Sequence, residues 1–204
     1  MISSSTSQQS VLKNKNVRGA IEIAVIIIIA IVGSIILRMF FLALFYIPSA
    51  SMDPYLKVND KIFVNKLAYT FHDVERGDII VFDAPDSVKN QNIEGSNAPQ
   101  IKDLIKRVVG LPGETVEGRC ELETVNQCVV DIYINGKKLN EPYLSKNISY
   151  APFEPIEIPA NSVLAMGDNR DDSEDGRFFG PTPKKSIIGR AFFRLWPSSR
   201  FGFL

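Results

Sequence analysis

The chain has 204 residues, enough for one domain of ordinary size together with a membrane anchor. Its 23 basic and 23 acidic residues cancel, so the chain lacks the positive field that holds nucleic acid, and we exclude nucleic-acid partners. Apolar residues make up an ordinary 45% of the chain, but much of this fraction is concentrated near the N-terminus.

The first predicted elements are a polar tail and a long apolar helix. Residues 1–18 begin with a Ser/Gln-rich stretch and contain basic but no acidic residues, and we expect them to be disordered and cytoplasmic. Residues 23–37 carry no charge, and a helix over residues 19–44 would be long enough to cross a bilayer. Because basic flanks stay in the cytoplasm, the sequence predicts a single-pass plasma-membrane anchor with residues 45–204 outside.

Two other readings of this apolar run are a cleaved signal peptide and a buried core helix. A signal peptide has a shorter apolar run followed closely by an A-x-A-like cleavage site, which is not found here. A helix that is apolar on all sides fits lipid better than a protein core. We therefore favour an uncleaved anchor.

Two serines follow the predicted anchor in a segment that prolines restrict. Residues 48–54 read PSASMDP, and Pro48 and Pro54 favour extended backbone around them. In an extended segment Ser49 and Ser51 share one face, so one hydroxyl could attack a substrate while the other donates to an oxyanion. On the residues alone, a Ser-rich linker after the anchor remains the alternative.

Beyond the anchor, short runs with a two-residue period predict a mostly β domain, an antiparallel sheet or barrel-like fold. Asn135-Gly136 directly follows one of these runs and is a strong signal for a two-residue hairpin. The polar residues 89–100 show no period, and we expect an exposed loop there. The predicted strands are residues 61–69, 78–82, 105–109, 129–134, 162–167 and 187–196.

The residue types present limit the chemistry of this domain. His72, the only histidine, lies between two strand runs, and the chain has no GxSxG motif, which argues against a Ser-His-Asp triad. A Ser-Lys arrangement remains, because strand alternation places Lys106 and Val108 on one face and Arg107 on the other. On a dry face the amine would lose its charge and serve as a general base. A solvated lysine at a strand edge is the ordinary alternative.

Cysteines and clustered carboxylates give no indication of a metal. Cys120 and Cys128 lie in the part predicted to be outside, where a disulfide can form, and two buried free thiols are the alternative. Two cysteines without a nearby histidine do not make a zinc site. The acidic residues between 168 and 175 lack the EF-hand pattern, and the basic residues Arg170 and Arg177 lie within the same segment, so we predict no calcium site.

Three segments together resemble type I signal peptidases, which are Ser-Lys serine peptidases. PSASMDP (48–54), LIKRVVGLPGE (104–114) and GDNRDDSEDGR (167–177) are similar to the family's serine box, lysine box and late glycine–aspartate box, in the family's order. The resemblance implies a membrane-anchored serine endopeptidase that removes N-terminal signal peptides from secreted precursor proteins. It implies no metal and no cofactor, and it makes precursor proteins and membrane lipid the partners.

The resemblance also implies roles for residues at matching positions. Ser51 would be the nucleophile, and Lys106 would be the general base and then the acid that protonates the leaving amine. The hydroxyl of Ser49 and the backbone N–H of Ser51 would bind the oxyanion. Ser173 would hydrogen-bond the Lys106 amine and orient it.

Supporting residues follow from the same resemblance. Asp175 and Arg177 would form a structural ion pair, and the two cysteines stand where some members of the family have a disulfide. Ile47, Met52 and Ile105 would line shallow pockets for small substrate side chains.

The chain departs from the family pattern at three positions without losing a catalytic group. Ala50 replaces a common Gly, and we expect an extended backbone to tolerate it. Asp172 replaces an Asn, and Leu104 replaces an aromatic residue and would widen one pocket. The alternative functions are a self-cleaving Ser-Lys autoprotease and a non-catalytic, membrane-anchored β domain that binds peptides.

Overall fold

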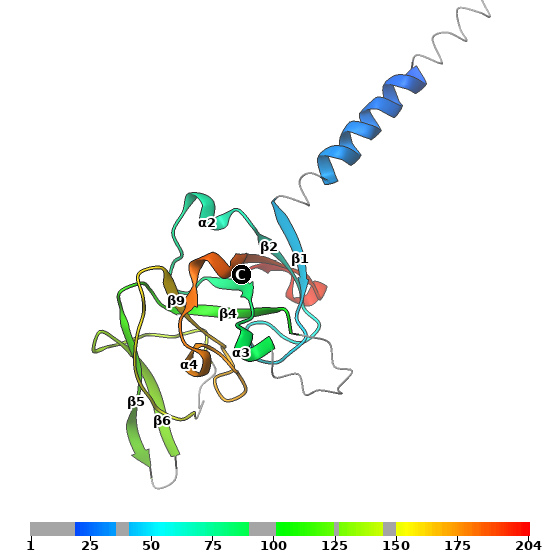
Figure 1. The fold of residues 1–204 in the computed structure, drawn as a ribbon. Coiled ribbons are helices and arrows are strands. Elements are labelled where there is room, and N and C mark those ends of the chain that lie inside the picture. The colour runs from blue at the N-terminus through cyan, green and yellow to red at the C-terminus, as the bar shows by residue number, and fades with distance from the viewer. Residues whose placement is uncertain (1–18, 36–40, 90–100, 125–126, 145–149) are drawn as a thin grey trace, which may run out of the picture. The chain divides into compact units, whose positions relative to one another are not determined.

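The computed structural model separates the chain into two units, Met1–Leu42 and Ala43–Leu204, which are described in turn (Figure 1). The residues that the structure describes are 19–35, 41–89, 101–124, 127–144 and 150–204, without the side chains of residues 121–128.

The N-terminal unit contains a helix over residues 19–35 whose apolar side chains are exposed. Ile26 is 65% exposed and Ile29 is 66% exposed. Among the described residues, no helix combines the length and apolarity that crossing a membrane requires.

The predicted anchor over residues 19–44 differs from the structure at its end. Residues 36–40 lie outside the described part, and Leu42–Tyr46 form strand β1 instead of continuing a helix. Aromatic side chains favour strands, and pairing with strand β2 satisfies the backbone groups of β1. The predicted helix end at residue 44 is therefore wrong.

The second unit is built mainly from antiparallel strands, as predicted. Its larger sheet has the order β1-β2-β11-β3-β4-β9-β10, and β12 pairs with β11. Its central pairs, from β2–β11 to β4–β9, are antiparallel. After β1, the strands of this sheet are β2 (Lys61–Asn65), β3 (Ile79–Asp83), β4 (Asp103–Gly110), β9 (Ser162–Met166), β10 (Thr182–Pro183), β11 (Ile187–Trp196) and β12 (Gly202–Phe203).

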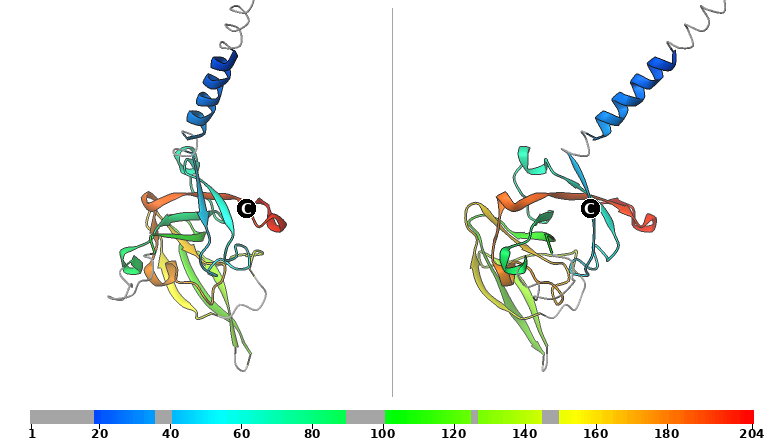
Figure 2. Two further views of the ribbon diagram at one scale, coloured as in Figure 1. Left: turned by 90° about the vertical axis from the view of Figure 1, so that its right-hand side faces the viewer. Right: turned by 45° about the vertical axis from the view of Figure 1, so that its right-hand side comes forward.

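A smaller sheet has the order β7-β6-β5-β8, and its long hairpin extends away from the larger sheet in both views of Figure 2. Asn135 and Gly136 have φ of 50° and 78° and join β6 to β7 as a two-residue turn, which confirms the predicted hairpin. The strands of this sheet are β5 (Thr115–Thr124), β6 (Gln127–Ile134), β7 (Lys137–Lys138) and β8 (Phe153–Glu157).

The described helices of the second unit are single turns. The strand predicted over residues 61–69 stops at Asn65, because α2 begins three residues later. Most of the loop predicted at residues 89–100 lies outside the described residues. The helices are α2 (Ala68–Phe71), α3 (Asp86–Lys89), α4 (Gly176–Phe179) and the 3₁₀ turns η1 (Lys184–Ser186) and η2 (Ser198–Arg200).

The apolar core forms three clusters that meet around β4. The first contains Ile47, Met52 and Leu56 from the segment that follows β1. Val109 belongs to the second cluster and Val108 to the third, so β4 is buried on both faces. This burial carries the polar residues of β4 into the interior of the domain.

Candidate active site

Ser51 lies in a turn that buried apolar side chains fix to the core. Ile47 and Met52 are at most 1% exposed on either side of it. The Asp53 N–H donates to the Ala50 carbonyl at 2.9 Å, which closes the turn. Ala50 is not among the described residues with positive φ, so no left-handed strain arises there.

Lys106 reaches Ser51 from β4. Its side chain is buried with 3% exposure, and its Nζ donates a hydrogen bond to Ser51 Oγ over 2.7 Å. Burial lowers the pKa of this amine to about 8, against the opposing charges of Asp175 and Asp168. A neutral amine in contact with a serine hydroxyl is the arrangement that a serine nucleophile needs for deprotonation.

Potential oxyanion donors lie beside this pair. The Ser49 hydroxyl is exposed and donates to Ser51 Oγ at 3.3 Å. The backbone N–H of Ser51 has no hydrogen-bond partner among the described residues. The Ser51 N–H is therefore free for a substrate oxygen, and the exposed Ser49 hydroxyl can rotate from Ser51 Oγ toward the same oxygen.

Ser173 packs near the nucleophile segment, but its hydroxyl does not make the expected hydrogen bond to the lysine. Its Oγ is buried and makes no hydrogen bond in the described structure. It packs over Gly167, where an added Cβ would stand 2.2 Å from Ser173 Oγ and 2.5 Å from the Ser51 carbonyl oxygen. The predicted hydrogen bond to Lys106 is not formed, and the Ser173 side chain packs against Gly167 instead.

Asp175 and Arg177 form a buried ion pair, with 2.8 Å between Nε and Oδ1. Asp175 also accepts the N–H of Gly167 at 2.9 Å and begins helix α4 as its N-cap. Burial alone would raise the pKa of this carboxyl, but the Arg177 charge and hydrogen bonds hold the pKa below its ordinary value. The pair fixes the segment that packs against the nucleophile.

A second buried pair was not predicted. Arg107 binds Asp168 through two hydrogen bonds of 2.8 and 2.7 Å, and its guanidinium also lies over the rings of Tyr55 and Tyr143. Tyr55 belongs to the segment after Ser51, so Arg107 links β4 to the nucleophile segment. The sequence signal was an arginine beside the candidate base, pointing to the opposite face of a buried strand.

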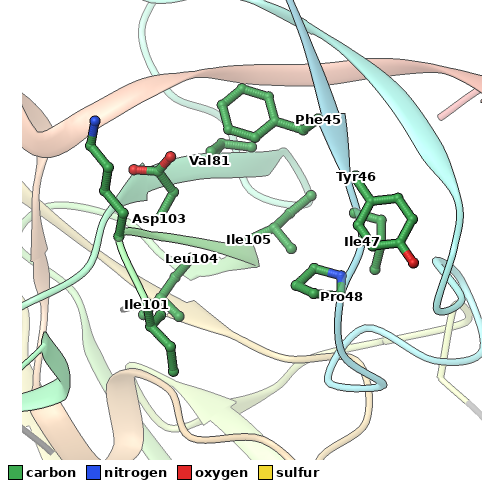
Figure 3. A pocket seen from close by; sticks show the side chains of 10 residues that line it. Phe45, Tyr46, Ile47, Pro48, Val81, Ile101, Asp103, Leu104 and Ile105 are labelled. Atoms are coloured by element: carbon green, nitrogen blue, oxygen red, sulfur yellow. The ribbon is translucent and has the colours of Figure 1, made fainter. Parts of the chain in front are cut away.

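An apolar groove of about 360 Å³ lies between β1 and the start of β4 (Figure 3). Pro48 and Ile105 line it and are the chain neighbours of Ser49 and Lys106. The complete lining is Phe45, Tyr46, Ile47, Pro48, Val81, Ile101, Lys102, Asp103, Leu104 and Ile105.

Two of the three predicted pocket residues, Ile47 and Ile105, line this groove. Met52 is absent from the lining and is fully buried in the core instead. The reason is that residues 51 and 52 begin a turn, so Met52 does not follow the alternation of an extended segment.

The two cysteines and the histidine are the remaining sequence candidates. Cys120 is disulfide-bonded, and the side chain of Cys128 lies outside the described part of the chain. His72 is exposed at the end of α2. No three described His, Cys, Asp or Glu side chains are placed together to hold a metal ion.

Comparison with known proteins gives consistent matches. The family model "Signal peptidase, peptidase S26" matches residues 20–196. Probable signal peptidase I-2 of Synechocystis is 36% identical over 90% of this chain and 77% of that protein. Signal peptidase I of Leptolyngbya laminosa is 44% identical over 77% of this chain and 70% of that protein. A crystal structure of a signal peptidase I from Enterococcus faecalis has 29% identity and a TM-score of 0.41, covering 58% of this chain and 97% of that chain.

Proposed function

The chain belongs to the signal peptidase family, peptidase S26, and on that basis we propose that it cleaves signal peptides with Ser51 as nucleophile and Lys106 as general base. The observation that carries this proposal is the 2.7 Å hydrogen bond from a buried amine to the Ser51 hydroxyl. A Ser-Lys pair of this kind requires no histidine, metal or cofactor.

The proposed reaction starts from the neutral Lys106 amine. As Ser51 Oγ attacks the scissile carbonyl, Lys106 takes its proton, and the carbonyl oxygen becomes an oxyanion. The N–H of Ser51 and the hydroxyl of Ser49 donate to that oxygen. The protonated Lys106 then gives its proton to the leaving amine, which leaves an acyl-enzyme. In the second half, Lys106 accepts a proton from water as the water attacks the ester.

The groove supplies the place for the substrate. In our proposal the residues before the scissile bond lie extended along it, because it is apolar and its lining includes Ile105, the chain neighbour of Lys106. Ile47 and Ile105 would contact small substrate side chains next to the bond that is cleaved. Precursor proteins that carry signal peptides are accordingly the proposed substrates.

We also propose that the N-terminal helix anchors the enzyme, with the N-terminus cytoplasmic and the catalytic domain outside the plasma membrane. The support is the exposed apolar surface of residues 19–35 and the basic, acid-free segment that precedes them. The full chain should resist alkaline extraction from membranes, whereas a variant with Ile26, Ile27 and Ile29 replaced by Lys should be extracted. Equal extraction of both proteins would refute this role.

The test of the catalytic proposal is cleavage of a precursor by three single variants. Ser51→Ala and Lys106→Ala should lose activity, and His72→Ala should retain it. Full activity of either of the first two variants would overturn the assignment. Cleavage of the enzyme alone, without any cleavage of precursors, would instead support a self-cleaving protease. Binding of peptides without reaction of Ser51 would support the non-catalytic alternative.

A further inference from the structure

Asn169 makes two hydrogen bonds to the nucleophile segment. Its backbone N–H donates to the Ser51 carbonyl oxygen at 3.1 Å. Its side-chain Nδ2 donates to the Ala50 carbonyl oxygen, also at 3.1 Å. Asn169 therefore holds two consecutive carbonyl groups of the turn that carries the nucleophile.

The Ala50 carbonyl matters because of the peptide group to which it belongs. This carbonyl and the N–H of Ser51 are parts of one planar, trans peptide unit, so they point in opposite directions. Fixing the direction of the carbonyl fixes the direction of the N–H. That N–H has no partner among the described residues, which leaves it free for a substrate oxygen.

Two donors hold this carbonyl. The Asp53 N–H bonds to it at 2.9 Å from within the turn, and Asn169 bonds to it from another part of the chain. The first bond closes the turn, and the second ties the peptide plane to the segment that Asp175 and Gly167 fix in the core. Without Asn169 the turn would remain, but its peptide plane would be free to tilt.

We propose that Asn169 is a positioning residue of the oxyanion hole, whose side-chain amide acts through the Ala50 carbonyl to aim the Ser51 N–H at the developing oxyanion. The inference rests on the proposed function of Ser51. Asn169 does not touch the substrate. The residues on either side of Asn169 bind elsewhere, since Asp168 pairs with Arg107 and Arg170 pairs with Glu141.

Loss of the Asn169 side chain should weaken stabilisation of the transition state, so the expected change is in kcat. Removal of an entire oxyanion donor lowers kcat by about 10²–10³-fold. A donor that is present but less well aimed should cost less, and we expect kcat to fall by about 10- to 100-fold. KM should stay nearly constant, because the groove that binds the substrate is unchanged.

The test uses Asn169→Ala and the similarly shaped Asn169→Leu in the full chain. Both variants keep the backbone N–H that bonds to Ser51 and lose only the side-chain donor. Besides kcat and KM on a precursor, the affinities for a peptide aldehyde and for the matching peptide alcohol are measured. The aldehyde forms a tetrahedral adduct with a serine, and the alcohol does not. Aldehyde affinity should fall with kcat, while alcohol affinity and the pH dependence should stay unchanged.

Asp171→Ala is the matched control, because Asp171 is an exposed residue of the same segment, and it should have normal kinetics. Unchanged kcat, an equal loss of aldehyde and alcohol affinity, a rise in KM alone, or a shifted pH dependence would each overturn the inference. So would failure of both Asn169 variants to fold, which would make the residue a structural one. Activity of Ser51→Ala would refute the proposed function itself, whereas an inactive Ser51→Ala beside fully active Asn169 variants refutes only this inference.

Discussion

The pH dependence of cleavage tests the proposed base most directly. Burial lowers the pKa of Lys106 from its ordinary value of 10.5 to about 8. The difference corresponds to about 3 kcal/mol against the charged amine. At pH 7 about one-tenth of the enzyme would then hold a neutral amine, whereas an amine with an ordinary pKa would be neutral in only about 0.03% of molecules.

The measurement is kcat/KM for a precursor between pH 6 and pH 10, combined with thermal unfolding at each pH. We expect kcat/KM to rise about tenfold for each pH unit and to level off near pH 8, while the protein stays folded. A midpoint near pH 10 would refute the claim that burial makes Lys106 a base. A profile without any acid limb would refute its role as the base altogether.

Three further predictions concern stability and substrate binding. The Lys106→Met variant should be inactive, but near neutral pH its free energy of unfolding, measured with denaturant, should be higher by up to about 3 kcal/mol. The reason is that a buried lysine with a lowered pKa destabilises the folded protein below pH 8. This cost disappears only as the pH rises toward 10.5. Equal or lower stability of that variant would contradict the desolvation argument. Gly167→Ala should lower both the melting temperature and kcat, at a cost of about 1–3 kcal/mol, because its Cβ would meet the Ser51 carbonyl oxygen at 2.5 Å. Wild-type activity in that variant would mean that the contact is loose. Ile101→Trp should narrow the groove and lower kcat/KM for precursors about tenfold, and unchanged kcat/KM would place the substrate elsewhere.

Much of the β fold could be predicted because its strands alternate or are apolar throughout. The predicted runs at 129–134 and 187–196 lie within β6 and β11. Strand β5 was missed because Gly118 stands at one of its buried positions and interrupts the apolar alternation, and β8 was missed because Pro155 lies in its middle. Hydropathy did not separate β1 from the anchor, since a run of apolar residues suits either lipid or a protein core.

The site could be predicted only where local chemistry indicated it. Ser51 and Lys106 stood out as reactive types in restricted or apolar surroundings, and the resemblance joined them. The contacts of Asn169 with the nucleophile segment span 119 residues, and no local period encodes such a distance. For Ser173 the motif correctly indicated a place near the site, but it did not determine the hydrogen-bond partner of the hydroxyl.

The segment from Gly167 to Arg177 has to meet two opposing electrostatic demands. It must hold the nucleophile turn rigidly, which it does with polar groups, yet the nearby amine of Lys106 must be able to lose its charge. A lone buried Asp175 would favour the protonated amine, and Arg177 reduces that effect while also satisfying the carboxylate. The ion pair therefore allows a buried acid to support the backbone at Gly167 with a smaller increase in the pKa of the base. On this reasoning Arg177 supports the chemistry as well as the fold, because the same charge that anchors the segment helps to keep Lys106 neutral.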